Sequence, residues 1–94
     1  MDIYDIRERI LASRYGFTDH ADLERTHDDL DLADLKSCIL SGEIIAEDSD
    51  TNRGTEYLIE GLTPRKTRLR VKVGIDDLDR VVFITVYAMK RRRR

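Results

Sequence analysis

The apolar residues near the start of the chain recur at the spacing of a helix. Ile3, Ile6 and Ile10 are separated by three and four residues, which aligns them along one side of a helix. This pattern predicts a helix over residues 2–15, with Asp2 as its N-cap. The first element should therefore bury a stripe of isoleucine side chains.

Two further helices are predicted before the pattern changes. Gly16 is expected to end the first helix in the left-handed conformation. A second, short helix should be capped at residues 18–19 and run to about Asp28. A third helix should begin after Asp31 and end at Gly42.

Beyond Gly42 the apolar residues alternate with polar ones, which is the period of a β-strand. The predicted strands cover residues 43–47, 55–62, 66–75 and 80–88. A polar loop is expected at residues 48–54, and the short connections elsewhere favour an antiparallel meander. The predicted fold class is α+β, with N-terminal helices packed on one face of a four-stranded antiparallel sheet. We expect residues 1–89 to form a single domain.

The third predicted strand carries all its positive charge on one face. Its cations are Lys66, Arg68, Arg70 and Lys72. Because the side-chain period of a strand is two, they should point away from the helices, with Arg70 near the middle of the face. Like charges in a row repel one another, so a fold tolerates them where an anion binds, and the phosphate of nucleic acid is the first candidate. The alternative is a solvated face on which the cations pair with Glu56 or Glu60 of the neighbouring strand.

The net charge of −2 hides a division between two halves of the chain. Residues 1–50 hold fourteen acidic and five basic side chains, whereas residues 51–94 hold five acidic and twelve basic ones. This division indicates nucleic-acid binding by the second half, or else mutual neutralisation of the two halves in the fold. Residues 90–94 form a basic tail that we expect to be disordered and, through Lys90, to add phosphate contacts.

Composition also indicates the compartment. The chain has 94 residues and no apolar run near the ~20 residues that span a membrane. Its acidic start lacks the basic and apolar parts of a signal peptide. Cys38 is the only cysteine, so no intrachain disulfide can form. We expect a cytoplasmic protein that does not contact membranes, with Cys38 in its core.

Four short motifs follow one another along most of the chain. They are Phe17-Thr18-x-His20-Ala21, Gly42-Glu43-Ile44-Ile45, Leu69-Arg70-Val71 and Ile84-Thr85-Val86-Tyr87. In order and spacing they resemble a family of small, largely uncharacterised bacterial proteins, which is itself similar to toxins of the RelE and MqsR type. Many relatives carry histidine at the position of Arg70, so no catalytic histidine is carried over to this strand.

The resemblance implies a RelE/barnase-like toxin architecture. It also implies a metal-independent endoribonuclease, an mRNA interferase, that belongs to a toxin–antitoxin pair. Two partners follow from it: RNA, either free or on the ribosome, and an acidic antitoxin protein.

Metal-independent RNA cleavage requires a base for the 2′-hydroxyl, cations for the phosphate and an acid for the leaving 5′-oxygen. Arg70 is the first candidate for the phosphate, because a guanidinium forms a planar fork of donors. His20 is the candidate acid or base, since histidine is the residue type suited to proton transfer near neutrality, and Tyr87 can also donate or accept a proton. The expected RNA-binding residues are Lys66, Arg68, Lys72 and Lys90.

Each assignment has a structural alternative. His20 can instead order the turn before the second helix, and Tyr87 can be a half-buried packing residue. The spacing of His20, Glu24 and His27 suits a metal in principle but supplies no fourth ligand, and we expect no metal and no cofactor.

Two non-catalytic functions also fit the sequence. A binding module of the same fold would dock its basic face on nucleic acid or on an acidic protein, and this function is favoured if His20 and Tyr87 lie far from Arg70. A protein-interaction domain would instead use the acidic residues Asp28, Asp29 and Asp31.

Overall fold

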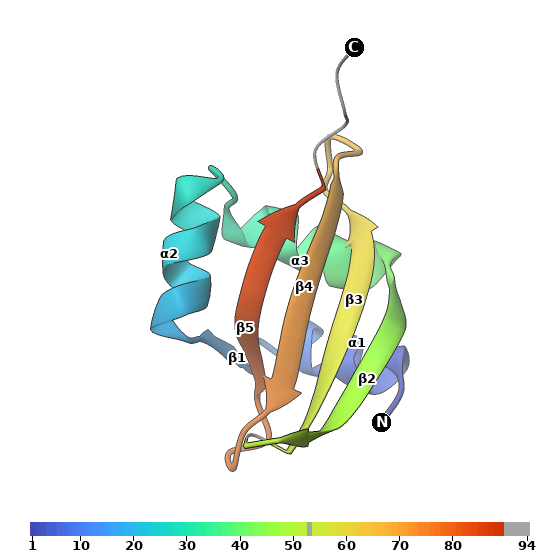
Figure 1. Ribbon diagram of the computed structural model, residues 1–94. Coiled ribbons are helices and arrows are strands. Elements are labelled where there is room, and N and C mark those ends of the chain that lie inside the picture. Colours follow the sequence, from blue (N-terminus) through green and yellow to red (C-terminus); the bar gives the residue numbers. More distant parts are fainter. Residues whose placement is uncertain (53, 90–94) are drawn as a thin grey trace.

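The computed structural model describes residues 1–52 and 54–89, and these residues form three helices and one five-stranded sheet (Figure 1). The helices are α1 (Ile3–Leu11), α2 (Asp19–His27) and α3 (Leu32–Ser41). The strands are β1 (Tyr15–Phe17), β2 (Glu43–Thr51), β3 (Gly54–Leu62), β4 (Arg68–Ile75) and β5 (Val81–Ala88). Across the sheet the order is β1-β5-β4-β3-β2, so β4 is central. The predicted α+β class is confirmed, and the basic tail at 90–94 lies outside the described residues.

Each helix begins where the sequence places its start: at Asp2, within residues 18–19, and directly after Asp31. Asp2 accepts a hydrogen bond from the backbone N–H of Asp5, whose side chain accepts one in return from the N–H of Asp2. Thr18 caps α2, and Asp31 caps α3 through a second reciprocal pair with Asp34. These caps satisfy N–H groups that have no partner inside the helix.

The first helix is shorter than predicted, and a strand follows it. α1 ends at Leu11, and Ser13 rather than Gly16 has the left-handed conformation, with φ of 60°. Gly16 lies in β1, which pairs in parallel with β5, Tyr15 opposite Val81. The prediction of four antiparallel strands is therefore wrong, since the sheet is mixed and has a fifth strand. Three residues are too few to display the alternation by which a strand is found in a sequence.

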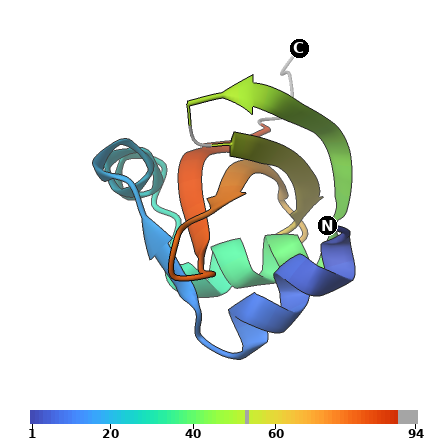
Figure 2. The same ribbon diagram turned by 90° about the horizontal axis from the view of Figure 1, so that it is seen from below.

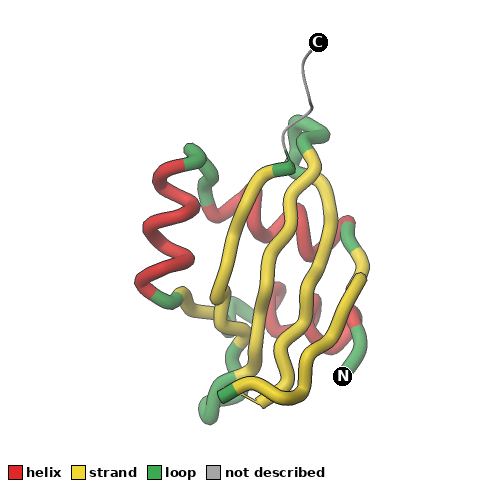
Figure 3. The backbone as a smooth tube through the Cα atoms, viewed as in Figure 1, coloured by secondary structure: helices red, strands yellow, loops and turns green. Residues whose placement is uncertain are grey.

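β2 and β3 form a longer hairpin than predicted (Figure 3). β2 continues to Thr51 and β3 starts at Gly54, so the polar loop predicted at residues 48–54 is wrong. Gly54, with φ of 82°, supplies the tight reversal. Residues 45–50 are all exposed, and a strand exposed on both faces shows no alternation of apolar and polar positions.

α1 and α3 cover one face of the curled sheet, and the hydrophobic core lies between these layers (Figure 2). The inward residues of β4, Leu69, Val71 and Val73, are 0% exposed. Cys38 of α3 is buried as predicted, and burial raises the pKa of its thiol to about 12. No helix of the described residues covers the opposite face of β3, β4 and β5, which we call the outer face (Figure 1).

α3 packs directly onto β3 at Gly61. A Cβ atom at Gly61 would lie 2.8 Å from the carbonyl carbon of Cys38 and closer still to the carbonyl oxygen. Gly42, just after α3, would in the same way meet the backbone of Glu60 at 2.9 Å. The absence of a side chain at both glycines lets the helix lie against the strand.

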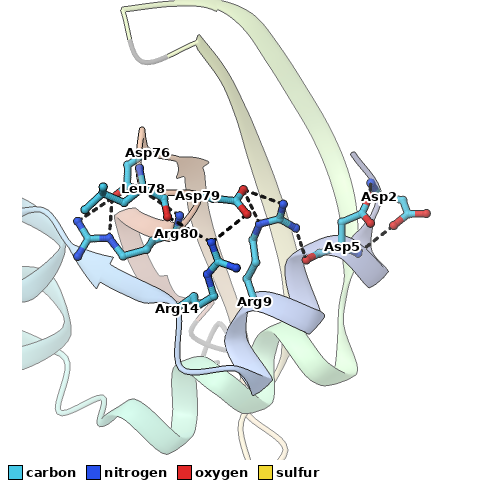
Figure 4. Close-up of polar contacts among 8 residues, drawn as sticks. All are labelled: Asp2, Asp5, Arg9, Arg14, Asp76, Leu78, Asp79 and Arg80. Carbon is cyan, nitrogen blue, oxygen red and sulfur yellow. Dashed lines mark hydrogen bonds and ion pairs between the residues drawn. The ribbon is translucent and has the colours of Figure 1, made fainter.

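The turn between β4 and β5 is tied to the first helix by Asp79 (Figure 4). Arg9 Nη2 lies 2.8 Å from Asp79 Oδ1, and Arg14 Nη2 lies 3.0 Å from Asp79 Oδ2. Within the turn, Asp76 accepts hydrogen bonds from the backbone N–H groups of Leu78 and Arg80. The hydrogen bond from Arg9 is the main reason that the pKa of Asp79 is lowered. One carboxylate thus links elements that lie far apart in the sequence.

Gly61→Ala should lower the free energy of unfolding by about 3 kcal/mol, because the new methyl group meets helix backbone, which cannot move aside like a flexible side chain. Gly16→Ala is the matched control, since a Cβ at Gly16 has no heavy atom within 4 Å. Urea denaturation of both variants measures the difference. Equal stability would contradict the close packing of α3 on β3.

Asp79→Asn should lower the thermal midpoint at pH 7 and change it little near pH 2. Because the pKa of Asp79 is lowered in the folded protein, its stabilisation is present above the ordinary aspartate pKa of ~3.9 and is lost as the pH falls through the folded value. Thermal unfolding of the variant and the wild type between pH 2 and pH 7 tests this. A destabilisation of the same size at both ends of that range would argue against the ion pairs with Arg9 and Arg14.

Candidate active site on the outer face of the sheet

Three side chains from neighbouring strands form one row across the outer face. Glu60 of β3 lies opposite Arg70 of β4, and Arg70 lies opposite Tyr87 of β5. Neighbouring strands are ~4.8 Å apart, so side chains in such a row can contact one another. Arg70 Nε donates a hydrogen bond to Glu60 Oε2 at 2.7 Å. A cation thus stands between a carboxylate and a phenol on the central strand.

The neighbours of Arg70 favour the protonated form of its guanidinium. The pKa of Arg70 is raised above its ordinary value. The hydrogen bond to Glu60 is the main cause, and the neighbouring Tyr87 is the second. An arginine guanidinium is a cation throughout the physiological pH range, and both contacts favour this charged form. Its side chain is 32% exposed, so a ligand on the outer face can reach it.

The remaining cations of the strand are less regular than the sequence suggests. Lys66 does not belong to the row, because β4 begins at Arg68 and Lys66 lies in the preceding turn with φ of 68°. Arg68 Nε lies 3.9 Å from Glu60 Oε1, and Lys72 Nζ lies 4.0 Å from Glu56 Oε1. The pairing of the strand cations with Glu56 and Glu60, which is the alternative to anion binding, is thus present. Lys90, the fourth candidate for RNA binding, lies outside the described residues.

A pocket of about 300 Å³ opens beside Tyr87, between α2 and β5. Its lining residues are His20, Leu23, Glu24, His27, Asp28, Val86 and Tyr87. His20 is 66% exposed, and its Nε2 atom lies 3.3 Å from Glu24 Oε1. The structure therefore brings His20 and Tyr87 to one pocket, and Tyr87 links that pocket to Arg70.

The edge of β5 explains why α2 lies here. β1 pairs with β5 only as far as Phe83, and α2 accompanies the rest of that edge. Thr18 Oγ1 donates to the carbonyl of Ile84 at 3.2 Å, and the N–H of Val86 donates to Glu24 Oε1 at 2.9 Å. A helix side chain thus replaces a partner strand. The turn before α2 is ordered by Thr18, whereas His20 points to the pocket.

Comparison with known proteins gives one result. Residues 17–88 match a family described as a domain of unknown function (DUF4258). The chain belongs to the DUF4258 family. The matched segment contains α2, α3 and the strands β2 to β5, and therefore the whole candidate site. No curated protein and no solved structure matches the chain.

Metal sites and membrane-spanning helices were sought in residues 1–52 and 54–89 of the DUF4258 chain, the residues that the structure describes. No group of three or more His, Cys, Asp or Glu side chains there is arranged to hold a metal ion, and the set of His20, Glu24 and His27 does not form one. Within the same residues, no helix is both long enough and apolar enough to cross a membrane.

From the sequence, Glu60 is expected only as an ion-pair partner of the strand cations and Glu24 only as one member of a possible metal set. The turn before β4 closes with a hydrogen bond from Thr63 N to Thr67 O, and counting outward from that pair puts Glu60 opposite Arg70. Glu24 is four residues from His20, which is the spacing of neighbours on a helix. The contact between Glu24 and the edge of β5 could not be found in this way, because it joins elements 62 residues apart.

Glu24→Ala should lower the free energy of unfolding by about 2 kcal/mol, because the N–H of Val86 loses a charged acceptor at a partly buried strand edge. Glu24→Gln keeps an acceptor oxygen and should lose roughly half as much. Amide hydrogen exchange at Val86 separates this local effect from general destabilisation, and it should accelerate most in the alanine variant. Unchanged exchange at Val86 would show that Glu24 does not close the edge of β5.

Proposed function

We propose that the protein is a metal-independent endoribonuclease that cleaves single-stranded RNA on the outer face of its sheet. The observation that carries the proposal is the row of Glu60, Arg70 and Tyr87, which adjoins the pocket that contains His20. The row and pocket together supply the groups that this reaction needs: a proton acceptor, a phosphate-binding cation and a proton donor. The proposal is supported by the position of Tyr87 directly beside Arg70 and by the pocket that Tyr87 shares with His20.

In the proposed reaction Arg70 binds a non-bridging oxygen of the scissile phosphate and stabilises the charge that develops there. Glu60, on one side of Arg70, accepts the proton of the attacking 2′-hydroxyl. The bond from O2′ to phosphorus forms as the bond from phosphorus to O5′ breaks, and His20, on the other side, protonates the leaving O5′. Tyr87 donates a hydrogen bond to the phosphate. The products are a 2′,3′-cyclic phosphate and a free 5′-hydroxyl, and no metal or cofactor takes part.

We also propose a biological role for the protein, which rests on the resemblance to toxins of the RelE and MqsR type. The protein would be the cytoplasmic toxin of a toxin–antitoxin pair, with the RelE/barnase-like arrangement of helices on one face of a sheet. An acidic antitoxin would cover the outer face, where Arg68, Arg70 and Lys72 gather. RNA would be taken either free or on the ribosome.

A non-catalytic nucleic-acid-binding or protein-binding module is the second candidate. It is favoured by one observation, that each strand cation already has a carboxylate partner within the fold. Under this alternative the outer face binds RNA or an acidic protein, and Arg70 contributes charge only.

Purified protein should cleave a fluorescently labelled single-stranded RNA in the presence of EDTA and leave a 2′,3′-cyclic phosphate, which mass spectrometry identifies. Arg70→Ala and His20→Ala should each reduce the rate by about a hundredfold or more, because they remove phosphate stabilisation and proton transfer respectively. Lys36→Ala is the matched control. It also removes one cation, but Lys36 lies over the ring of Tyr15, away from the row.

Two results would contradict the enzyme. The first is the absence of cleavage by the wild type both with and without ribosomes. The second is a rate in Arg70→Ala equal to that of the wild type. RNA binding that depends on Arg70, measured by fluorescence anisotropy in the absence of cleavage, would favour the non-catalytic module.

A further inference from the structure

A second hollow lies on the outer face, at the end of the sheet that holds the β2–β3 and β4–β5 turns. Its volume is about 290 Å³, close to the lower end of the ~300–1,000 Å³ that small-molecule sites occupy. Gly74 and Ile75 of β4 and Val82 and Ile84 of β5 supply most of its lining. It is separate from the pocket beside Tyr87 and shares no lining residue with it.

The row of cations on β4 ends in a glycine, Gly74, which lines the hollow. Gly74 is two residues beyond Lys72, so it occupies the next outward position of the strand. A Cβ at Gly74 would be 3.4 Å from Ile84 Cδ1 and 3.8 Å from the carbonyl oxygen of Thr55. The irregularity between Lys72 and Val73 leaves Ile84 as an extra residue of β5. Such a bulge re-aims a side chain, and here Ile84 lines the hollow.

The rim of the hollow is polar. Asn52 lies on it from the β2–β3 turn, and Asp76 and Asp77 lie on it from the β4–β5 turn. Asp76 is occupied within its own turn, where it accepts hydrogen bonds from the backbone and the side chain of Arg80. Asp77 is exposed and carries a carboxylate at the mouth. An apolar floor with hydrogen-bonding groups at the edge suits a flat heteroaromatic ring.

We propose that this hollow binds a nucleobase of the RNA strand, with guanine preferred, an inference that rests on the proposed endoribonuclease. The base would lie on Val82 and Ile84, and guanine would donate its N1–H and exocyclic amine hydrogens to the Asp77 carboxylate. Gly74 adds no side chain to the floor of the hollow, which Ile84 partly covers. The hollow would then fix which base the enzyme selects near the cleaved bond.

The position along β4 agrees with an RNA strand that follows the row of cations. Gly74 is four residues from Arg70, which is ~13 Å along a strand. Lys72 lies between them and is 40% exposed, so it can contact an intervening phosphate. The base in the hollow would therefore belong to a nucleotide near, but not adjoining, the phosphate at Arg70.

Titration of the wild type with GMP, AMP, CMP and UMP, followed by amide chemical shifts, tests the subsite without any cleavage. GMP should bind most tightly and shift the amides of Gly74, Val82 and Ile84. Gly74→Val should fill the hollow and weaken GMP binding by about tenfold, which corresponds to ~1.4 kcal/mol of lost contacts. Gly74→Ala fits without a clash and should give a smaller loss. Asp77→Asn should reduce the preference for GMP over the other nucleotides.

The outcomes separate this proposal from the proposed function. Shifts confined to the surroundings of Arg70 and Tyr87, or equal GMP binding by the wild type and Gly74→Val, would overturn the base subsite even if RNA cleavage is found. Cleavage by the wild type with the same fragment pattern in Gly74→Val would also overturn it. GMP binding in the hollow by a protein that cleaves no RNA would support the subsite and contradict the endoribonuclease.

Discussion

The two-residue period of β4 is the constraint on which the rest of the structure depends. Leu69, Val71 and Val73 are completely buried against the helical layer, so the residues between them must project to the outer face. A shift of one residue in the pairing of this strand would move its cations into the core. Burying several unpaired charges would cost more free energy than the folding of a small domain provides. Burial of three apolar side chains therefore fixes the position of Arg70. The register of β4 thus determines which side chains project to the outer face, although that face is open to solvent.

The same register decides which groups meet on the outer face. Once β3 is paired with β4, Glu60 has to stand beside Arg70, and once β5 is paired, Tyr87 has to stand on the other side. α2 then completes the arrangement for a reason unrelated to chemistry. The edge of β5 beyond β1 has an N–H group that needs a partner, and Glu24 supplies it. His20, one turn before Glu24, lines the same pocket as Tyr87 as a consequence of this structural contact.

The sequence predicts what depends on local patterns and fails where distant elements meet. The cap at Asp2, the cap within residues 18–19 and the start of the third helix after Asp31 are confirmed, because a helix start involves residues only three apart. The sequence does not predict β1, because this strand is stabilised by pairing with β5, more than sixty residues away, and because its three residues have no period of their own. The position of Arg70 at the middle of a sheet face follows from alternation alone. The proximity of His20 to Tyr87 does not, since it depends on a long-range contact of α2.

The ion pair between Arg70 and Glu60 bears on the charge division between the two halves of the chain. From the sequence, neutralisation of the basic side chains within the fold and phosphate binding by them are alternatives. The geometry of Arg70 makes the two compatible. A guanidinium has five N–H donors, and the bond to Glu60 Oε2 comes from Nε alone. Arg70 can thus be held by Glu60 and still offer donors to an arriving phosphate. A cation fixed in this way loses less side-chain entropy on binding than a mobile one. The Glu60 carboxylate therefore neutralises part of the positive charge of Arg70 and also orients the guanidinium of Arg70.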